Sequence, residues 1–220
     1  SIYYELYGEG SPVLLLHGAG GFLETMHYFV SALAPTHMVI AVDSRAQGRS
    51  TDSTAPLSYA QMGSDMIKLM DVLQIKQADV VGWSDGGIVG LDMAMKHPER
   101  VHRLIAIGAN YDVNGVPAKE LNPAVIRSLA AEVKPFYDSV APDPAHFPIL
   151  VQKLTTMLTH EPHYTIAELG RISARTLIVA GEHDMILRKH TDSLAHAIPG
   201  AREITVPGAS HFGPWEMPED

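Results

Sequence analysis

A serine between two glycines is the first residue pattern in this chain that is suited to covalent chemistry. Gly82-Trp83-Ser84-Asp85-Gly86 fits the pattern G-x-S-x-G, and it lies between an apolar stretch and a helical one. A serine at a strand-to-helix junction needs a sharp turn with small neighbours, and this turn lifts the hydroxyl above the sheet. The pattern predicts Ser84 as a nucleophile at a helix N-terminus, where partial positive charge favours a developing anion. The alternative is a helix cap in a tight glycine turn.

A serine hydroxyl is a weak nucleophile unless a base takes its proton and a carboxylate orients that base. Among twelve histidines, His211 is the best candidate, because it follows the last predicted strand in a loop of small residues. Asp184 follows the preceding strand, and both loops are expected at the carboxyl edge of a parallel sheet, where ligands bind. We therefore predict a triad of Ser84, His211 and Asp184, with Glu182 as the alternative acid. The competing interpretations are a surface histidine and a turn aspartate.

A glycine-rich loop, His17-Gly18-Ala19-Gly20-Gly21, follows the first buried apolar stretch. Acyl transfer needs two backbone N–H groups aimed at the carbonyl oxygen as it becomes negative. We expect the amides of Ala19 and Asp85 in this oxyanion hole, with Gly20 as the next candidate. The loop lacks the G-x-G-x-x-G spacing and the lysine of a phosphate loop, so nucleotide binding is not expected. His17 is expected to be structural.

Short apolar, β-branched stretches alternate with helical patterns along the chain, which is typical of an α/β fold with a mostly parallel sheet and helices on both faces. Such a sheet would bring the serine, aspartate and histidine loops to one edge. The predicted strands are residues 3–7, 13–17, 38–43, 78–83, 101–107, 176–180 and 203–206, and the predicted helices are residues 25–33, 57–73, 85–96 and 192–198.

The alternation stops between about residues 111 and 172, where Pro, Lys and Glu are more frequent and no clean strand is predicted. Helical segments are expected at 124–133 and 149–158. We interpret 111–172 as a small helical cap inserted into a single domain that spans 1–220. Substrate specificity should come from this cap folded over Ser84.

Aromatic residues and one carboxylate are the candidates for substrate contact. Trp83 and Phe212 flank predicted catalytic residues, and the cap supplies further aromatic side chains, for which packing against the core is the alternative role. Asp85 lies beside the nucleophile and could pair with a cationic group, and its alternative role is stabilisation of the helix dipole. The predicted substrate-binding residues are Gly20, Trp83, Asp85, Tyr111, Phe136, Phe147 and Phe212.

Composition excludes several other classes. The 220 residues carry a net charge of -9 with no basic cluster, which argues against nucleic acid as a partner. No stretch approaches the ~20 apolar residues of a membrane span, and the absence of cysteine removes disulfides and thiolate sites. His183 beside Asp184 has no further ligands at metal spacing, so neither a metal nor a cofactor is expected. No signal peptide is visible, and a cytoplasmic location is expected; the oligomeric state is left open.

Four stretches together resemble the α/β-hydrolase superfamily, in its small-cap serine esterase branch. They are Leu16-His17-Gly18-Ala19-Gly20, the loop 43–50, Gly82-Trp83-Ser84-Asp85-Gly86-Gly87, and the loops of Asp184 and His211. The third is similar to the valacyclovir-hydrolase (biphenyl-hydrolase-like) group. Arg45 and Arg49 of the second stretch are expected to hold their loop. The resemblance departs in its short N-terminal strands and in the absence of a predicted helix after His211.

The resemblance implies hydrolysis of a small carboxylic ester through an acyl-enzyme, without a cofactor. Amino-acid esters are accepted in the resembling group, which fits a cation-binding role for Asp85. Serine at position 84 excludes the dehalogenases and epoxide hydrolases of this fold, whose nucleophile is aspartate. Cleavage of a lactone, an activated amide or a C–C bond uses the same triad and stays open, as does a non-catalytic ligand receptor.

Overall fold

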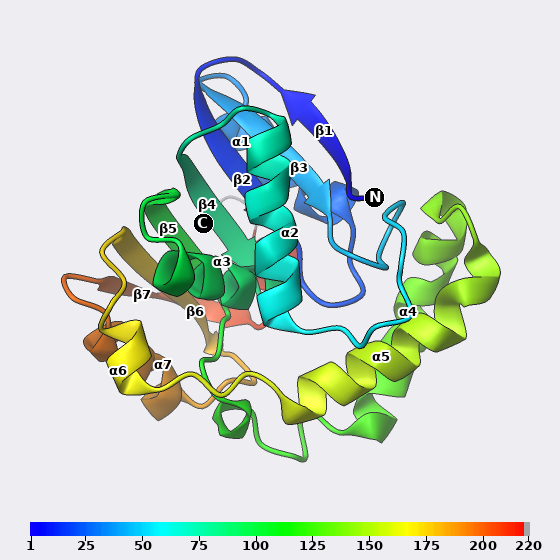
Figure 1. Cartoon of the computed structure of the whole chain (residues 1–220). Coiled ribbons are helices and arrows are strands. Elements are labelled where there is room, and N and C mark those ends of the chain that lie inside the picture. Colours follow the sequence, from blue (N-terminus) through cyan, green and yellow to red (C-terminus); the bar gives the residue numbers. More distant parts are fainter. Residues whose placement is uncertain (218–220) are drawn as a thin grey trace.

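Within residues 1–217, the part of the chain that the computed structural model describes, seven strands form one sheet in the order β1-β3-β2-β4-β5-β6-β7 (Figure 1). Only β1 is antiparallel to its neighbour, so the prediction of a mostly parallel sheet is confirmed. The strands are β1 Tyr3–Tyr7, β2 Ser11–Leu16, β3 His37–Asp43, β4 Ala78–Trp83, β5 Val101–Ile107, β6 Arg175–His183 and β7 Arg202–Ser210.

Residues 13–16 of β2 and 39–42 of β3 are apolar and buried because both faces of the sheet are covered there. Successive side chains of a strand point to opposite faces. Leu14 and Leu16 of β2 accordingly join the larger core cluster, whereas Val13 and Leu15 join a smaller cluster on the other face. The unbroken apolar pattern of residues 13–16 therefore reflects burial on both faces of the sheet.

Helices cover the two faces unequally (Figure 1). On the face of the larger cluster lie α2 (Tyr59–Val72), α3 (Asp85–Lys96), α6 (Ile166–Leu169) and α7 (Arg188–Ala197). On the other face lie α1 (His27–Leu33) and the short α8 (Gly213–Glu216). The expectation of no helix after His211 was wrong, because Pro214 and the packing of Trp215 against Trp83 support one short turn there.

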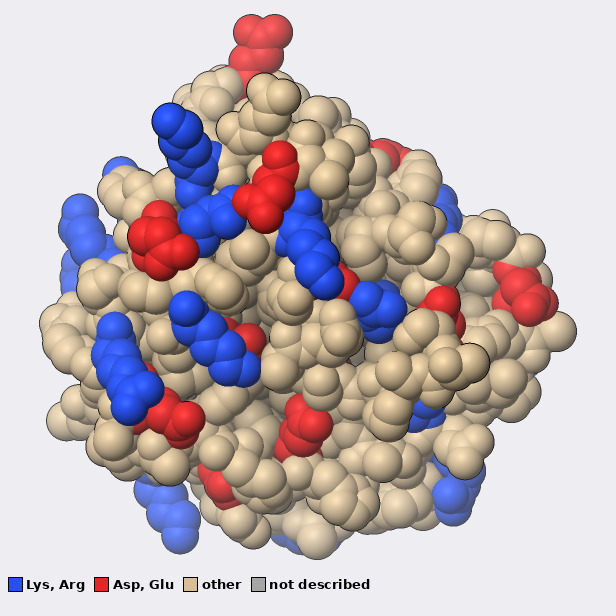
Figure 2. All heavy atoms as spheres, viewed as in Figure 1, with Lys and Arg blue, Asp and Glu red and all other residues tan. Residues whose placement is uncertain are grey.

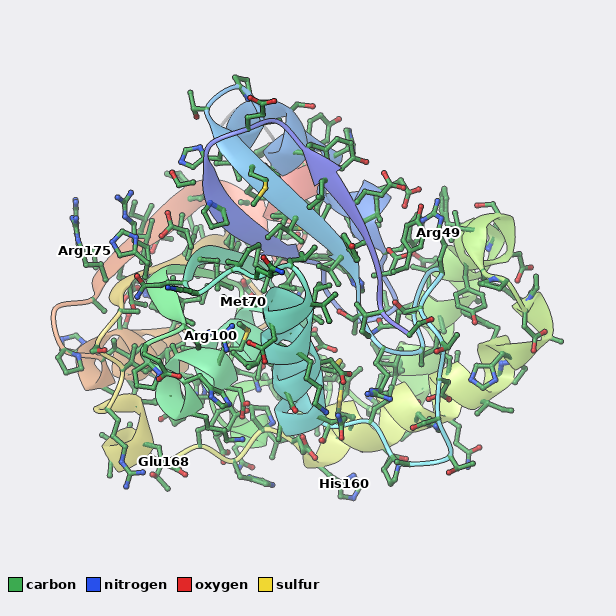
Figure 3. All side chains as sticks on the ribbon, turned by 45° about the horizontal axis from the view of Figure 1, so that its top comes forward. Arg49, Met70, Arg100, His160, Glu168 and Arg175 are labelled. Carbon is green, nitrogen blue, oxygen red and sulfur yellow. The ribbon has the colours of Figure 1, made fainter. Side chains whose placement is uncertain are left out.

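Helix α2 begins at a clear capping signal. The hydroxyl of Ser58 accepts a hydrogen bond from the amide of Gln61 at 3.1 Å, which satisfies one free N–H of the first turn. Met62, Met66 and Met70 follow at a spacing of four and are buried; Figure 3 labels Met70 on this helix. The cap and the methionine stripe together fix which side of α2, and hence of Tyr59, faces the core.

The segment between β5 and β6 forms two long helices, α4 (Pro123–Val140) and α5 (Phe147–His160), beside the sheet (Figure 1). Both predicted helical segments lie inside them, and α4 is longer than predicted because it continues through Pro135. Asp52, in the loop after β3, accepts hydrogen bonds from Nε2 of His146 at 2.8 Å and Nζ of Lys153 at 2.7 Å. These bonds tie the cap to the core loop.

No helix among residues 1–217 combines the length and apolar character that crossing a lipid bilayer requires.

Candidate active site

Ser84 occupies a strained turn between β4 and α3. Its φ is +53°, in the left-handed region that non-glycine residues seldom adopt and that recurs at functional sites. A Cβ at Gly82 would lie 2.2 Å from the carbonyl oxygen of Gly86, and a Cβ at Gly86 would lie 2.2 Å from that of Leu16. Glycine is therefore required at both positions of the predicted pattern, because a side chain at either one would collide with the backbone.

The three residues predicted as a triad meet at one hydrogen-bonded chain. Ser84 Oγ lies 3.0 Å from Nε2 of His211, and Nδ1 of His211 lies 2.9 Å from Oδ1 of Asp184. With the proton on Nδ1, that nitrogen donates to Asp184 while Nε2 accepts from the serine hydroxyl. The side chains of His211 and Asp184 are only 10% and 4% exposed, so water competes weakly for these bonds.

Both partners of Ser84 are fixed by the strands that precede them. Asp184 follows β6 directly, and its Oδ1 also accepts from the amide of Ile186 at 2.9 Å. His211 follows β7, and its carbonyl oxygen accepts from the indole N–H of Trp83 at 2.9 Å. Glu182, the alternative acid, instead accepts from the amide of Gly208 at 2.8 Å, and it is Asp184 that bonds to the imidazole.

The glycine-rich loop after β2 lies against the serine turn. The amide of Gly20 donates to Oε1 of Gln47 at 2.6 Å and is therefore occupied. The amides of Ala19 and Asp85, by contrast, have no hydrogen-bond acceptor within residues 1–217. Ala19, Ser84 and Asp85 line the same cavity. Two unoccupied donors beside the hydroxyl can stabilise a negative oxygen, and Gly20 is excluded as the second donor.

His17 holds this loop in place. Its Nδ1 donates to the carbonyl oxygen of Gly18 at 2.7 Å, and its Nε2 accepts from the amide of Ser44 at 2.9 Å. Burial lowers the pKa of His17, which keeps the ring neutral and able to accept at Nε2. The side chain thus joins the loops that follow β2 and β3 and has no atom left for catalysis.

A largely apolar cavity of about 120 Å³ opens next to Ser84. Of the residues predicted to contact substrate, Gly20, Trp83, Asp85, Phe147 and Phe212 line this cavity. Most of its remaining wall comes from aliphatic side chains of the cap, among them Ile126, Leu129 and Val133 of α4 and Leu150, Leu154 and Leu158 of α5.

Two predicted contacts, Tyr111 and Phe136, do not line the cavity and are corrections. The ring of Tyr111 stacks on His190 with centroids 4.0 Å apart, and its hydroxyl lies 3.1 Å from Oγ of Ser193. Phe136 is 61% exposed on the outer side of α4. The aliphatic wall was missed, although the spacing of Ile126, Leu129 and Val133 is a helical stripe that would have indicated it.

Within residues 1–217, Asp85 is the single carboxylate in the cavity lining. Its Oδ1 accepts from the hydroxyl of Tyr59 at 2.8 Å, whereas its buried Oδ2 has no partner among residues 1–217. The pKa of Asp85 is raised to about 6: burial is the main cause and the charge of Glu161 adds to it, whereas the Tyr59 hydrogen bond and the nearby His211 act in the opposite direction. A buried acceptor without a donor is costly, and a ligand can relieve that cost.

The two arginines of the loop after β3 are structural, as predicted. Arg45 makes a two-pronged ion pair with Asp65, with N···O distances of 2.7 and 2.6 Å. Arg49 pairs with Glu24 and Asp43 and lies over the ring of Tyr3. Neither arginine lines the cavity beside Ser84.

On the surface outside the active site, positively and negatively charged side chains are intermixed. On the face that carries α2 and α3, Lys and Arg side chains alternate with Asp and Glu without forming a basic field (Figure 2). In the described part of the chain, no three His, Cys, Asp or Glu side chains gather in a metal-binding arrangement.

Comparison with known sequences places this geometry among hydrolases. The model of the alpha/beta hydrolase family matches residues 13–220. A protein of Azorhizobium caulinodans named "Putative carbamate hydrolase RutD" is 28% identical over 235 residues, which cover 96% of this chain and 88% of that protein.

Two solved structures share the architecture over almost the whole chain. A hydrolase from Pseudomonas aeruginosa PA01 has a TM-score of 0.78 and 25% identity, covering 99% of this chain and 90% of that chain. Est816, described as an N-acyl homoserine lactone degrading enzyme, has the same TM-score of 0.78 and 25% identity, covering 99% of this chain and 92% of that chain.

Proposed function

The chain belongs to the alpha/beta hydrolase family, and from that membership we propose that it is a serine hydrolase which cleaves a small carboxylic ester. The observation that carries the proposal is the hydrogen-bonded chain from Ser84 Oγ through His211 to Asp184, with distances of 3.0 and 2.9 Å. A hydroxyl, a base and an orienting acid in this order are the parts that nucleophilic acyl transfer needs.

In the proposed mechanism, Ser84 attacks the ester carbonyl while Nε2 of His211 takes the hydroxyl proton. Asp184 holds the imidazole in the required tautomer and stabilises its positive charge. The amides of Ala19 and Asp85 donate to the carbonyl oxygen as it becomes negative. His211 then protonates the departing alcohol. Water, activated by the same histidine, hydrolyses the acyl-enzyme and restores Ser84.

The cavity supports a small acyl group with a mostly apolar body. Its volume of about 120 Å³ and the aliphatic side chains of α4 and α5 favour a short hydrocarbon part. Asp85 adds a binding site for a protonated amine on that acyl part, because its Oδ2 is buried without a hydrogen-bond partner in the described chain. An amino-acid ester combines these features.

A second candidate is cleavage of a cyclic ester or a carbamate by the same groups. Est816 is described as degrading N-acyl homoserine lactones, and the Azorhizobium caulinodans relative carries the name of a carbamate hydrolase. Both reactions start with attack on a carbonyl carbon and need the same base and oxyanion donors. A lactone differs from an open-chain ester in that its leaving alcohol stays attached to the acyl part, and a carbamate differs in that its acyl part is a carbamoyl group.

The decisive experiment compares the wild type with Ser84→Ala on p-nitrophenyl esters of short acids, a lactone and an aryl carbamate. We expect the wild type to turn over the short esters fastest, and Ser84→Ala to lose about a millionfold in kcat with its fold intact. Ser139→Ala, at an exposed helix position, is the matched control and should keep the wild-type rate. Tight ligand binding without turnover would instead indicate a receptor, and turnover that survives Ser84→Ala would contradict the proposal.

A further inference from the structure

Tyr59 is a buried polar residue that the proposed mechanism does not use. It is the first residue of α2, is 1% exposed, and packs in the main core cluster. Its hydroxyl donates to Oδ1 of Asp85 at 2.8 Å. Packing alone would be satisfied by phenylalanine, so the hydroxyl is the feature that needs an explanation.

The position of Tyr59 is fixed at both ends. Its amide donates to Oε2 of Glu161 at 3.1 Å, where the cap helix α5 ends, and Ser58 caps the turn that carries it. The ring itself lies among buried side chains of the core. The hydroxyl therefore points at Asp85 from a rigid support, which is what a precise subsite requires.

Fixing one oxygen of a carboxylate also fixes the other. Because Tyr59 occupies Oδ1, the plane of the Asp85 carboxylate cannot turn freely, and Oδ2 is left as the buried acceptor without a donor among the described residues. We propose that Tyr59 is a positioning residue for substrate selection, which orients Asp85 so that Oδ2 receives a charged N–H group on the acyl part of the substrate. This inference rests on the proposed function.

Tyr59 also influences the charge of Asp85. Three groups act on this carboxylate from the elements packed around it: the hydroxyl of Tyr59 on α2, Glu161 at the end of α5, and His211 after β7. Burial raises the pKa of Asp85 to about 6, and the hydrogen bond from Tyr59 counters that rise. Without the hydroxyl, Asp85 stays protonated to a higher pH and pairs less well with a cation.

The test uses two p-nitrophenyl esters that differ by one group, the alanyl ester and the isobutyryl ester, in which a methyl replaces the ammonium. The measured quantity is the ratio of their kcat/KM values between about pH 4.5 and 7, where an α-amine with a pKa of about 7.7 remains protonated. Groups that act on both esters, such as His211, change the two kcat/KM values by the same factor when they titrate, so their titration does not change the ratio. In the wild type it should rise with pH as Asp85 ionises, with a midpoint near pH 6.

In Tyr59→Phe, we expect this midpoint to move to higher pH and the ratio at pH 7 to fall about tenfold, the value of one hydrogen bond to a charged group. The isobutyryl ester should keep its kcat/KM within about threefold, because it makes no charged contact. Asp85→Asn should make the ratio independent of pH.

The chain supplies a matched control. The hydroxyl of Tyr164 donates to Oδ1 of Asp92 at 2.9 Å, a second tyrosine–aspartate pair whose members do not line the cavity. Tyr164→Phe should therefore leave the ratio and its midpoint unchanged.

An equal loss on both esters, or an unmoved midpoint in Tyr59→Phe, would overturn the inference while leaving the serine mechanism standing. If Tyr59→Phe does not fold, the pH dependence of the kcat/KM ratio in the wild type and in Asp85→Asn is the test. A wild-type ratio that does not change with pH also overturns the inference. Failure of the serine hydrolase proposal is recognised separately, by turnover of the isobutyryl ester in Ser84→Ala.

Discussion

The carboxyl edge of the sheet and the cap wall meet in one cavity but are built differently. At the edge, Ser84, His211 and Asp184 are held by hydrogen bonds of 3.0 and 2.9 Å and by glycines that have no room for a side chain. The wall consists largely of aliphatic side chains of α4 and α5, which are positioned by packing.

Because of this difference, substitutions at the edge and substitutions in the wall should have different consequences. Hydrogen bonds are directional, so a small change of atom type at the edge alters the reaction geometry. Apolar contacts are non-directional and scale with buried area, so a change in the wall alters stability and the shape of the cavity. Asp85 lies where the two regions join, and among the described residues of the lining it is the one carboxylate that is buried.

Among changes that leave the nucleophile Ser84 in place, the largest effect is expected at the edge, from Asp184→Asn. The amide nitrogen would face Nδ1 of His211 and favour the tautomer with the proton on Nε2, which cannot accept from Ser84. We expect kcat for a p-nitrophenyl ester to fall about ten-thousandfold with KM nearly unchanged. Steady-state kinetics measures both.

Glu182→Gln is the control for this prediction, because Glu182 bonds to Gly208 and not to the imidazole. It should stay within about threefold of the wild-type kcat, less than the effect of a single hydrogen bond. Equal losses in the two variants would mean that the edge is not organised around Asp184.

The edge could be predicted from the sequence because its determinants are local. The glycines around Ser84, the loop of small residues before His211 and the position of Asp184 after a strand are each visible within five residues. Strand alternation then requires the three loops to share an edge. The structure brings all three side chains together, and it separates Ala19 from Gly20 through the bond of Gly20 to Gln47.

The wall could not be predicted in the same way because it depends on tertiary packing. Aromatic residues were expected to shape it, yet Tyr111 stacks on His190 and Phe136 is exposed. Which face of α4 is turned inward depends on how the cap docks, for example through Asp52 and Lys153, which are 101 positions apart in the chain. The contact of Tyr59 with Asp85 was not predicted for the same reason, since the two residues are 26 positions apart in the chain.

A change in the wall should affect stability more than chemistry. Leu150 is fully buried and lines the cavity from α5, so Leu150→Ala should lower the free energy of unfolding by about 2–5 kcal/mol. The variant should retain most of kcat for a short ester and gain relative kcat/KM for bulkier acyl groups, because the wall recedes. Denaturant unfolding and a series of acyl lengths measure these effects.

Ile149→Ala provides the comparison for Leu150→Ala, because Ile149 is the preceding residue of the same helix and is 47% exposed. It should change the free energy of unfolding by about 1 kcal/mol or less and leave the preference for acyl length as it is. If Leu150→Ala lost kcat as severely as Asp184→Asn, the wall and the edge would not be functionally separate.

The smallest effect is expected at Asp85, where the two regions join, and there the substitution should raise the free energy of unfolding instead of lowering it. The pKa of Asp85 is about 6 in the folded chain against 3.8 for an ordinary aspartate, so the folded state binds more protons between these values and loses stability as the pH rises through them. Asp85→Asn should therefore raise the free energy of unfolding at pH 7 by on the order of 2 kcal/mol, and this gain should shrink as the pH falls from about 6 toward 4. Thermal unfolding at several pH values measures the gain, and Asp138→Asn at an exposed helix position should show none. If Asp85→Asn were less stable than the wild type at pH 7, the carboxylate of Asp85 would have adequate hydrogen-bond partners in the folded chain. Its Oδ2 atom would then gain little from binding a ligand.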